Sequence, residues 1–246
     1  MERERDSIKI DLHVHSEGSY DAHESVEHIL EHAQDIDLDA IAITDHNEIE
    51  KSLEAKEKAE EYGIIAIPGA EVSTSDGHLL ALGVEQLPEK GRPFMETVQK
   101  VRDMGGIAVV PHPFQRMRHG VKKSKIKDCD AMEVYNSWLF TGWRNRKAKK
   151  FAKKENYPEV ASSDAHTLGM VGKAYTEINT AFAEKESLTQ EDVLEAVKNG
   201  SNYIYGKRKP IPLSTWDYGK ALLKKIGWFM KETFFLPVKL ERKIFP

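Results

Sequence analysis

The sequence contains a single cysteine, Cys129, in 246 residues. A disulfide needs two cysteines, so none forms within the chain, and we expect a reducing compartment. No run approaches the ~20 apolar residues of a membrane-spanning helix. The charged stretch 1–6 also lacks the apolar core of a signal peptide. We therefore expect a cytoplasmic protein.

An excess of positive charge is also missing. The 36 lysine and arginine residues face 40 acidic residues, which gives a formal net charge of −4. Residues 214–246 hold seven basic and three acidic residues, so the rest of the chain is acidic. Because binding along a phosphate backbone needs clustered cations, we expect no broad nucleic-acid surface on this body. A nucleotide or a short nucleic-acid end remains a possible partner.

Short apolar runs alternate with polar, helix-like stretches along the body, which indicates an α/β fold of parallel strand–helix units. A closed or nearly closed barrel of such units has its chemistry at the carboxyl ends of the strands. The predicted strands are 8–15, 40–44, 64–67, 78–82, 107–110, 131–135 and 159–162. The predicted helices are 25–36, 48–62, 94–104, 143–155 and 189–198.

Histidine is placed where these strands end. Side chains alternate faces along a strand, so Asp11, His13 and His15 point the same way, within reach of a common ion. Asp164 and His166 repeat this spacing. Imidazole and carboxylate together suit zinc, manganese or iron as divalent ions. The further candidates at strand ends are Asp45, His46, Glu71, His78 and His112.

The order of these motifs resembles the PHP family, named for polymerase and histidinol phosphatase, over residues 8–209. The resemblance implies a distorted seven-stranded β/α barrel that holds two or three divalent metal ions. It assigns one metal to His13, His15, Glu71 and Asp164. It assigns a second to Glu71, His78 and His112, and a third to Asp21, His46 and His166.

One position departs from the family pattern. The family often has an aspartate where this chain has Tyr20, and Asp21 follows it. Asp21 ligates the third metal if the loop bulges by one residue. Asp11 and Asp45 are predicted to accept an N–H from a metal-bound imidazole and so to fix its tautomer.

The predicted reaction is phosphoester hydrolysis. Three dications outweigh the charges of Asp21, Glu71 and Asp164, so the pocket attracts a dianionic phosphate and stabilises charge on a phosphoryl group. A metal-bound hydroxide then serves as the nucleophile for a small phosphate monoester, a nucleotide or an oligonucleotide end. The predicted phosphate-binding residues follow His112 and are Arg116, Arg118 and Lys122.

Two alternatives remain at this point. A non-catalytic scaffold, as in ribonuclease P subunits that resemble this barrel, should have lost metal ligands and gained a basic surface. A metal-dependent amidohydrolase often uses a carbamylated lysine as the metal bridge, whereas Glu71 is available for that role here.

The composition changes near Pro210, so we place the catalytic domain at 1–212 and a tail at 213–246. Apolar residues recur at helical spacing in this basic tail, which predicts an amphipathic helix. It either packs on the barrel or contacts an anionic membrane or a partner protein.

Overall fold

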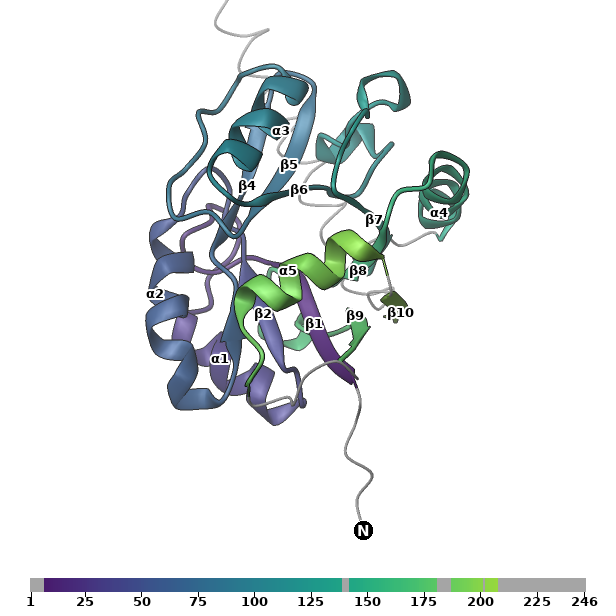
Figure 1. Cartoon of the computed structure of the whole chain (residues 1–246). Coiled ribbons are helices and arrows are strands. Elements are labelled where there is room, and N and C mark those ends of the chain that lie inside the picture. Colours follow the sequence, from purple (N-terminus) through teal and green to yellow (C-terminus); the bar gives the residue numbers. More distant parts are fainter. Residues whose placement is uncertain (1–6, 139–141, 181–186, 201, 208–246) are drawn as a thin grey trace, which may run out of the picture. The chain divides into compact units, whose positions relative to one another are not determined.

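The strands of the protein form two five-stranded sheets. The structure is a computed structural model and describes residues 7–138, 142–180, 187–200 and 202–207 (Figure 1). The first sheet has the order β10-β9-β1-β2-β3 and the second the order β4-β5-β6-β7-β8. The strands of the first sheet are β1 (Ser7–Val14), β2 (Ala40–Ile43), β3 (Ile65–Ala66), β9 (Ala174–Asn179) and β10 (Asn202–Gly206). Those of the second are β4 (Gly69–Thr74), β5 (Gly77–Leu82), β6 (Ile107–Val110), β7 (Ala131–Asn136) and β8 (Glu159–Ser162).

The mixed α/β fold is confirmed, but the expectation of uniformly parallel strands is wrong. β4 pairs antiparallel with β5, and β5 pairs antiparallel with β6. In the first sheet β9 lies antiparallel between β1 and β10. Since β4 and β5 are joined by two residues only, they form a hairpin, and a hairpin is antiparallel by construction. Within the described residues the regular pairing closes no barrel, and ten strands replace the seven expected.

Two isolated bridges join the sheets. Val14, at the end of β1, pairs with Ala165 just after β8, and His46, just after β2, pairs with Glu71 in β4. A shared buried core also links them, because Leu12 of β1 and Val109 of β6 belong to one apolar cluster. Both connections lie where the predicted ligands are.

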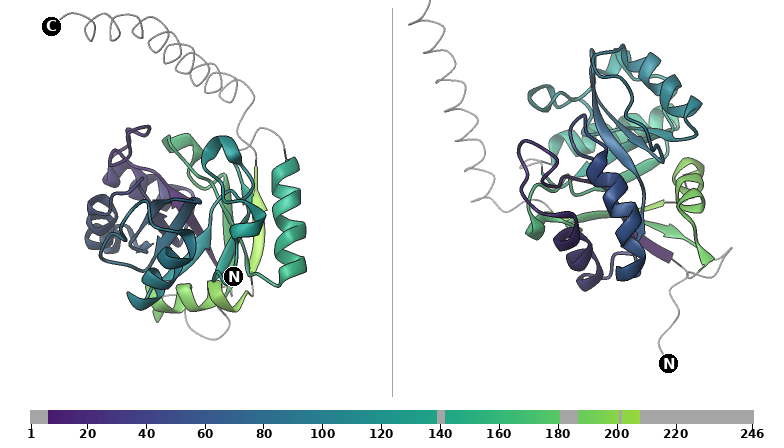
Figure 2. Two further views of the ribbon diagram at one scale, coloured as in Figure 1. Left: turned by 90° about the horizontal axis from the view of Figure 1, so that it is seen from above. Right: turned by 90° about the vertical axis from the view of Figure 1, so that its left-hand side faces the viewer.

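Helices cover the outer faces of both sheets (Figures 1 and 2). The helices α1 (Val26–Asp35) and α2 (Glu50–Lys58) pack against β2. The helices α3 (Phe94–Asp103) and α4 (Trp143–Glu155) share a core cluster with β6 and β7. The helix α5 (Gln190–Asn199) covers the core that the two sheets share. Figure 1 and the left view of Figure 2 place α4 on the side opposite α1 and α2.

The predicted helices are confirmed to within a few residues. Ser25 caps α1 by accepting a hydrogen bond from the His28 amide, and Thr189 and Asp192 form the capping box that starts α5. Among the described residues no helix has the length and apolar character that crossing a membrane requires. The predicted tail 213–246 and its boundary lie outside the described residues.

Candidate metal centre

The carboxyl ends of four strands and one hairpin bring the predicted ligands together. His13 lies near the end of β1 and His15 just beyond it, while His46 follows β2 and His112 follows β6. Asp164 and His166 follow β8, and Glu71 and His78 come from the β4–β5 hairpin. Asp21 lies on the loop between β1 and α1. Each of the nine has a donor atom within 3.7 Å of another member's donor atom.

Glu71 is the central residue of this cluster. Its Oε1 lies 2.8 Å from His78 Nδ1 and 2.8 Å from His112 Nε2. Its Oε2 lies 2.8 Å from His46 Nδ1. The Nε2 atoms of His13 and His15 are each 3.7 Å from one of its oxygens. A carboxylate that is 1% exposed and contacts five imidazoles is in the position that a bridging ligand needs.

Asp164 is the second buried carboxylate. Its Oδ1 lies 3.6 Å from ring nitrogens of His13, His15 and His166. Its Oδ2 accepts hydrogen bonds from Asn136 Nδ2 at 2.7 Å and from Arg118 Nη1 at 2.5 Å. One oxygen is therefore held by the protein and the other faces the imidazoles.

Asp21 stands at the solvent side of the cluster. Its carboxylate oxygens lie 3.6 Å from His46 Nε2 and 3.3 Å from His166 Nε2, and its side chain is 33% exposed. The adjacent Tyr20 stacks on the His46 ring, with centroids 5.1 Å apart. The loop thus presents Asp21 to the ring nitrogens even though Tyr20 occupies the position expected for the acid.

The arrangement of donor atoms fits divalent ions. Four groups of three donors have all their ligand atoms within 4.8 Å of one another: His13–His15–Glu71, His46–Glu71–His78, His13–His112–Asp164 and His15–His46–His166. Among the described residues, His112 Nδ1 and Asp164 Oδ1 are buried without a hydrogen-bond partner. The Nε2 atoms of His13 and His15 also face each other at 3.1 Å. Buried nitrogen and carboxylate donors that converge in this way, two of them without a hydrogen-bond partner, suit zinc, manganese or iron.

The carboxylates and imidazoles of the cluster shift one another's pKa values. Burial favours neutral Glu71, but His78 and His13 outweigh burial and hold the pKa of Glu71 well below its usual value. Burial also disfavours charge on His46, yet hydrogen bonds to Asp21 and Glu71 raise its pKa to about 10. Burial lowers the pKa of His15 to about 3. Glu71 is therefore anionic at neutral pH, as a carboxylate that binds a cation must be.

Further residues orient the predicted ligands. Glu133 Oε1 lies 3.3 Å from His13 Nδ1, and Glu133 Oε2 accepts from the His112 amide at 2.6 Å. Ser19 Oγ lies 3.0 Å from His15 Nδ1. Sequence reasoning missed Ser19, because a serine in a loop has no pattern that marks it. Glu133 lies between the buried apolar residues Met132 and Val134 of β7, and a charged residue within such a strand is a sign of a functional site.

Asp11 and Asp45 do not make the contacts expected of them. Asp11 accepts from the backbone amides of Ser163 at 2.9 Å and Gly172 at 3.0 Å. Asp45 accepts from the Ser16 amide and from the hydroxyl of Ser19, both at 2.7 Å. Both aspartates therefore shape the loops, and Asp45 reaches an imidazole only through Ser19.

Strained backbone fixes two of the candidate ligands. His112 has φ of 28° and Asp164 has φ of 55°, values that side-chain-bearing residues seldom adopt. The loop after His112 folds back so closely that a Cβ at Gly120 would lie 2.4 Å from the His112 carbonyl oxygen. Only glycine fits there, and its close approach supports the conformation of His112.

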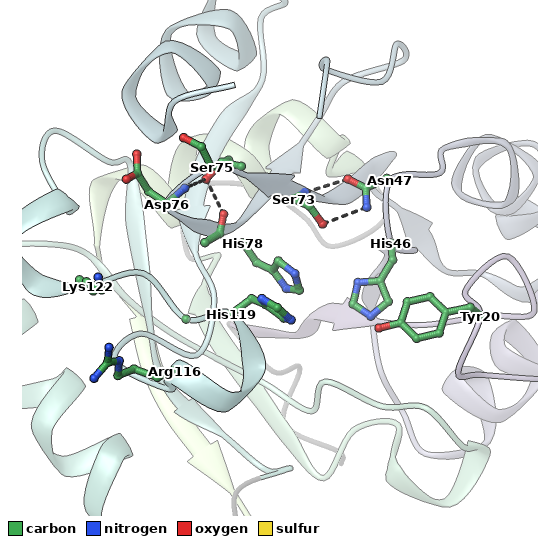
Figure 3. Close-up of a pocket in the computed structure, with 13 residues that line it drawn as sticks. Tyr20, His46, Asn47, Ser73, Ser75, Asp76, His78, Arg116, His119 and Lys122 are labelled. Carbon is green, nitrogen blue, oxygen red and sulfur yellow. Dashed lines mark hydrogen bonds between the residues drawn. The ribbon is translucent and has the colours of Figure 1, made fainter. Parts of the chain in front are cut away.

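A cavity of about 400 Å³ opens beside the donor cluster (Figure 3). His46 and His78 form its inner wall, and His119 stacks on His78 with centroids 5.1 Å apart. Arg116 and Lys122 lie on the side opposite Tyr20. The predicted phosphate-binding residues are thus divided: Arg116 and Lys122 line the cavity, whereas Arg118 is bound to Asp164.

Comparisons with known proteins agree with this geometry. The family model described as PHP-associated matches residues 142–202. A crystallised two-domain protein of Bacteroides vulgatus, described as containing a predicted PHP-like metal-dependent phosphoesterase, superimposes with a TM-score of 0.66 at 21% identity. The superposition covers 81% of this chain and 65% of that one. Residues 142–202 thus match a PHP-associated model, and the chain shares the fold of this PHP-like protein.

Two proteins of the archaeon Methanocaldococcus jannaschii are similar to this chain in sequence. The uncharacterized protein MJ1587 is 30% identical over 142 residues, which cover 53% of this chain and 83% of MJ1587. The uncharacterized protein MJ0417 is 28% identical over 226 residues, which cover 87% of this chain and 90% of MJ0417. The similarity to MJ0417 therefore extends over most of this chain.

Proposed function

We propose that the protein is a metal-dependent phosphoesterase that hydrolyses a phosphate monoester, including the terminal phosphate of a nucleotide or an oligonucleotide. One observation carries the proposal: a single buried carboxylate, Glu71, lies at the centre of five imidazoles beside a cavity with two cationic side chains. The two isolated bridges that join the sheets lie at this same centre.

We assign two or three divalent ions to this centre. His13, His15, Glu71 and Asp164 would hold the first, and Glu71, His78 and His112 the second. Asp21, His46 and His166 would hold the third. When bound, such ions polarise a phosphoryl oxygen and lower the pKa of water at the centre.

The chain's own residues bind and orient the substrate. Arg116 and Lys122 reach the cavity as cations, and among the described residues neither forms an ion pair, so both are available to a phosphate. Asn136 and Arg118 hold Asp164 Oδ2 and keep the carboxylate turned toward the imidazoles. Glu133 and Ser19 fix the rings of His13 and His15. A phosphoryl group in the cavity would thus lie between the cations of Arg116 and Lys122 and the preorganised donor cluster.

The alternatives receive less support. A non-catalytic scaffold has no need for nine converging donors, five of which are buried histidines. For an amidohydrolase with a carbamylated lysine, a lysine should lie among the donors. Within the described residues, none of the contacts of the nine involves a lysine, and Glu71 occupies the bridging position.

Two substitutions test the proposal. His13→Ala and Glu71→Gln should each lower the metal content, measured by elemental analysis, and reduce hydrolysis by at least about 1,000-fold. The substrates are p-nitrophenyl phosphate, nucleoside bisphosphates and short oligonucleotides, each with manganese, zinc or iron. Glu96→Gln, which removes an exposed carboxylate of α3, is the matched control and should change neither quantity. Full activity of both variants at wild-type metal content would reject the proposal.

A further inference from the structure

Positive charge is concentrated in one stretch of the described chain. Residues 116–155 contain thirteen of the 36 lysine and arginine residues but only four of the 40 acidic residues. The rest of the chain therefore holds 23 basic and 36 acidic residues. The acidic average of the body, which argued against a nucleic-acid surface, conceals a strongly basic region.

Six of these thirteen cations are exposed on α4. The buried residues of α4 are Asn145, Ala148, Phe151 and Ala152. The opposite side carries Trp143, Lys147, Lys150 and Lys154 at intervals of three or four residues, so they form one stripe. Arg146 and Lys153 flank that stripe and are also exposed. Among the described residues, no acidic side chain forms an ion pair with Arg146, Lys147, Lys150 or Lys153.

The loop that follows β6 extends this basic side. Lys123 Nζ lies 5.3 Å from the ring centroid of Phe151 in α4, and Lys147 Nζ lies 4.8 Å from that of Phe114 in the loop. Arg144 also donates a hydrogen bond to the Phe114 carbonyl oxygen. These contacts hold the loop against α4. We call the loop cations and the outward side of α4 the basic face; its members are Arg116, Lys122, Lys123, Arg146, Lys147, Lys150, Lys153 and Lys154.

The basic face is continuous with the candidate active site. Arg116 and Lys122 belong to the loop and also line the cavity beside His46 and His78 (Figure 3). A polyanion that lies along α4 can therefore place one of its phosphates, and in particular its end, beside the donor cluster. Trp143 is 61% exposed at the start of the stripe, with Lys147 Nζ 5.9 Å from its ring centroid. An exposed indole among cations is the arrangement that stacks an unpaired base.

We infer that the basic face is a binding surface for single-stranded nucleic acid, which leads the strand end toward the metal centre. The inference extends the proposed phosphoesterase to a polymeric substrate, but the binding surface stands on its own observations. An anionic membrane fits less well. Among the described residues of the basic region, only Met117 and Trp143 are exposed large apolar side chains. Two isolated side chains do not form the apolar face that a membrane-bound helix inserts.

The test measures binding directly, with the full-length protein and its metals. The probe is a fluorescein-labelled 20-nucleotide single strand with a phosphorothioate backbone, made as DNA and as RNA, and binding is followed by anisotropy. The test variant is Arg146→Gln/Lys150→Gln/Lys153→Gln. The matched control, Lys90→Gln/Lys100→Gln/Lys198→Gln, removes three exposed lysines that form no ion pair among the described residues. Circular dichroism verifies that both fold.

We expect the α4 variant to bind at least tenfold more weakly than wild type, and the control less than twofold. Each cation that neutralises a phosphate of a single strand contributes ~0.7 to the slope of log K against log salt. Since three such cations are removed, the slope of the α4 variant should be smaller by about two. Trp143→Ala should weaken binding about tenfold and leave the slope unchanged.

Three outcomes would overturn the inference. Equal weakening in the α4 variant and the control would mean that net charge alone binds the strand. No binding by the wild type would exclude the surface, and so would binding only to phosphatidylserine vesicles. Hydrolysis of p-nitrophenyl phosphate by the wild type is measured in parallel, because its absence would reject the phosphoesterase without bearing on strand binding.

Discussion

Arg118 donates a hydrogen bond from Nη1 to Asp164 Oδ2 over 2.5 Å, and its guanidinium carbon lies 5.2 Å from the ring centroid of Trp138. Burial alone would raise the pKa of Asp164, but Arg118 and His13 outweigh burial and hold that pKa well below its ordinary value. Arg118 thus keeps Asp164 anionic and leaves Oδ1 free to face three imidazoles.

Arg118→Ala should therefore lower kcat/KM for p-nitrophenyl phosphate by about 100-fold, the loss typical of removing one preorganised electrostatic group. Arg118→Lys should recover part of the rate, since it restores the charge without the planar fork. Arg116→Ala is the comparison: it should raise KM and leave the metal content unchanged. Wild-type kcat/KM in Arg118→Ala would show that Asp164 needs no support from this arginine.

Removal of metal should destabilise the fold. Ions that bind only the folded state stabilise it by mass action, about 3 kcal/mol at 100 times Kd, which corresponds to a Tm change of roughly 5–10 °C in a protein of this size. Treatment with EDTA should lower Tm by that amount in differential scanning fluorimetry, and added manganese or zinc should restore it. Glu71→Gln should show no response to EDTA, and an equal response would place the stabilising ion elsewhere.

Gly120→Ala should disturb the centre through the backbone. Its Cβ would lie 2.4 Å from the His112 carbonyl oxygen and 2.6 Å from the Gln115 nitrogen, and neither backbone atom can move cheaply. We expect a loss of about 2 kcal/mol in the free energy of unfolding, measured with urea, together with reduced metal content. Gly169→Ala is the matched control, because its Cβ would meet no atom within 4 Å. A fully metallated Gly120→Ala protein would contradict this account.

Two aspartates that share Arg102 should differ in their effect on stability. Asp130, whose side chain is 6% exposed, accepts from Arg102 and from the Ala108 amide at 2.8 Å, while Asp128 is 77% exposed. Asp130→Asn should cost about 1–2 kcal/mol in urea unfolding, whereas Asp128→Asn should cost less than about 0.5 kcal/mol. Equal effects would mean that burial of Asp130 contributes nothing.

Cys129 should be inert in the folded protein and should make stability fall at high pH. Burial raises the pKa of its thiol to about 12, whereas an unfolded cysteine has a pKa of about 8.5. Below the lower value both states carry the proton; above it the unfolded state ionises first, so stability is lost as pH rises toward 12. Relative to Cys129→Ala, the wild type should lose about 2 kcal/mol between pH 8 and pH 10. Rapid labelling of the native thiol by a disulfide reagent at pH 8 would contradict the burial.

The sequence predicted the elements of this fold better than their directions. Apolar runs marked β2 and β6 because they are buried on both faces, whereas β4 carries Glu71 and two hydroxyl residues and β10 is largely exposed, so neither has such a run. The reversal of β5 depends on Gly77, whose φ of 139° permits the tight turn. A single glycine within a polar stretch does not reveal this from the sequence.

Within the candidate centre, the residue types were predictable but their partners were not. The spacing of His13 and His15 predicted that both face one ion, and their Nε2 atoms do lie 3.1 Å apart although the pairing of β1 with β2 is irregular between Asp11 and Val14. Asp45 and Arg118 lie on loops, where no periodicity fixes the direction of a side chain. The same reason explains why the basic face escaped notice: α4 and the loop after β6 are separate in sequence, and only packing joins their charges.

The two bridges between the sheets have a consequence for how the protein matures. His46 pairs with Glu71, and Val14, between His13 and His15, pairs with Ala165, between Asp164 and His166. The stretches that fasten the two halves together are thus the stretches that carry the donors. The complete set of donors therefore comes together only when the two sheets are joined, so full metal affinity should appear at the last stage of folding.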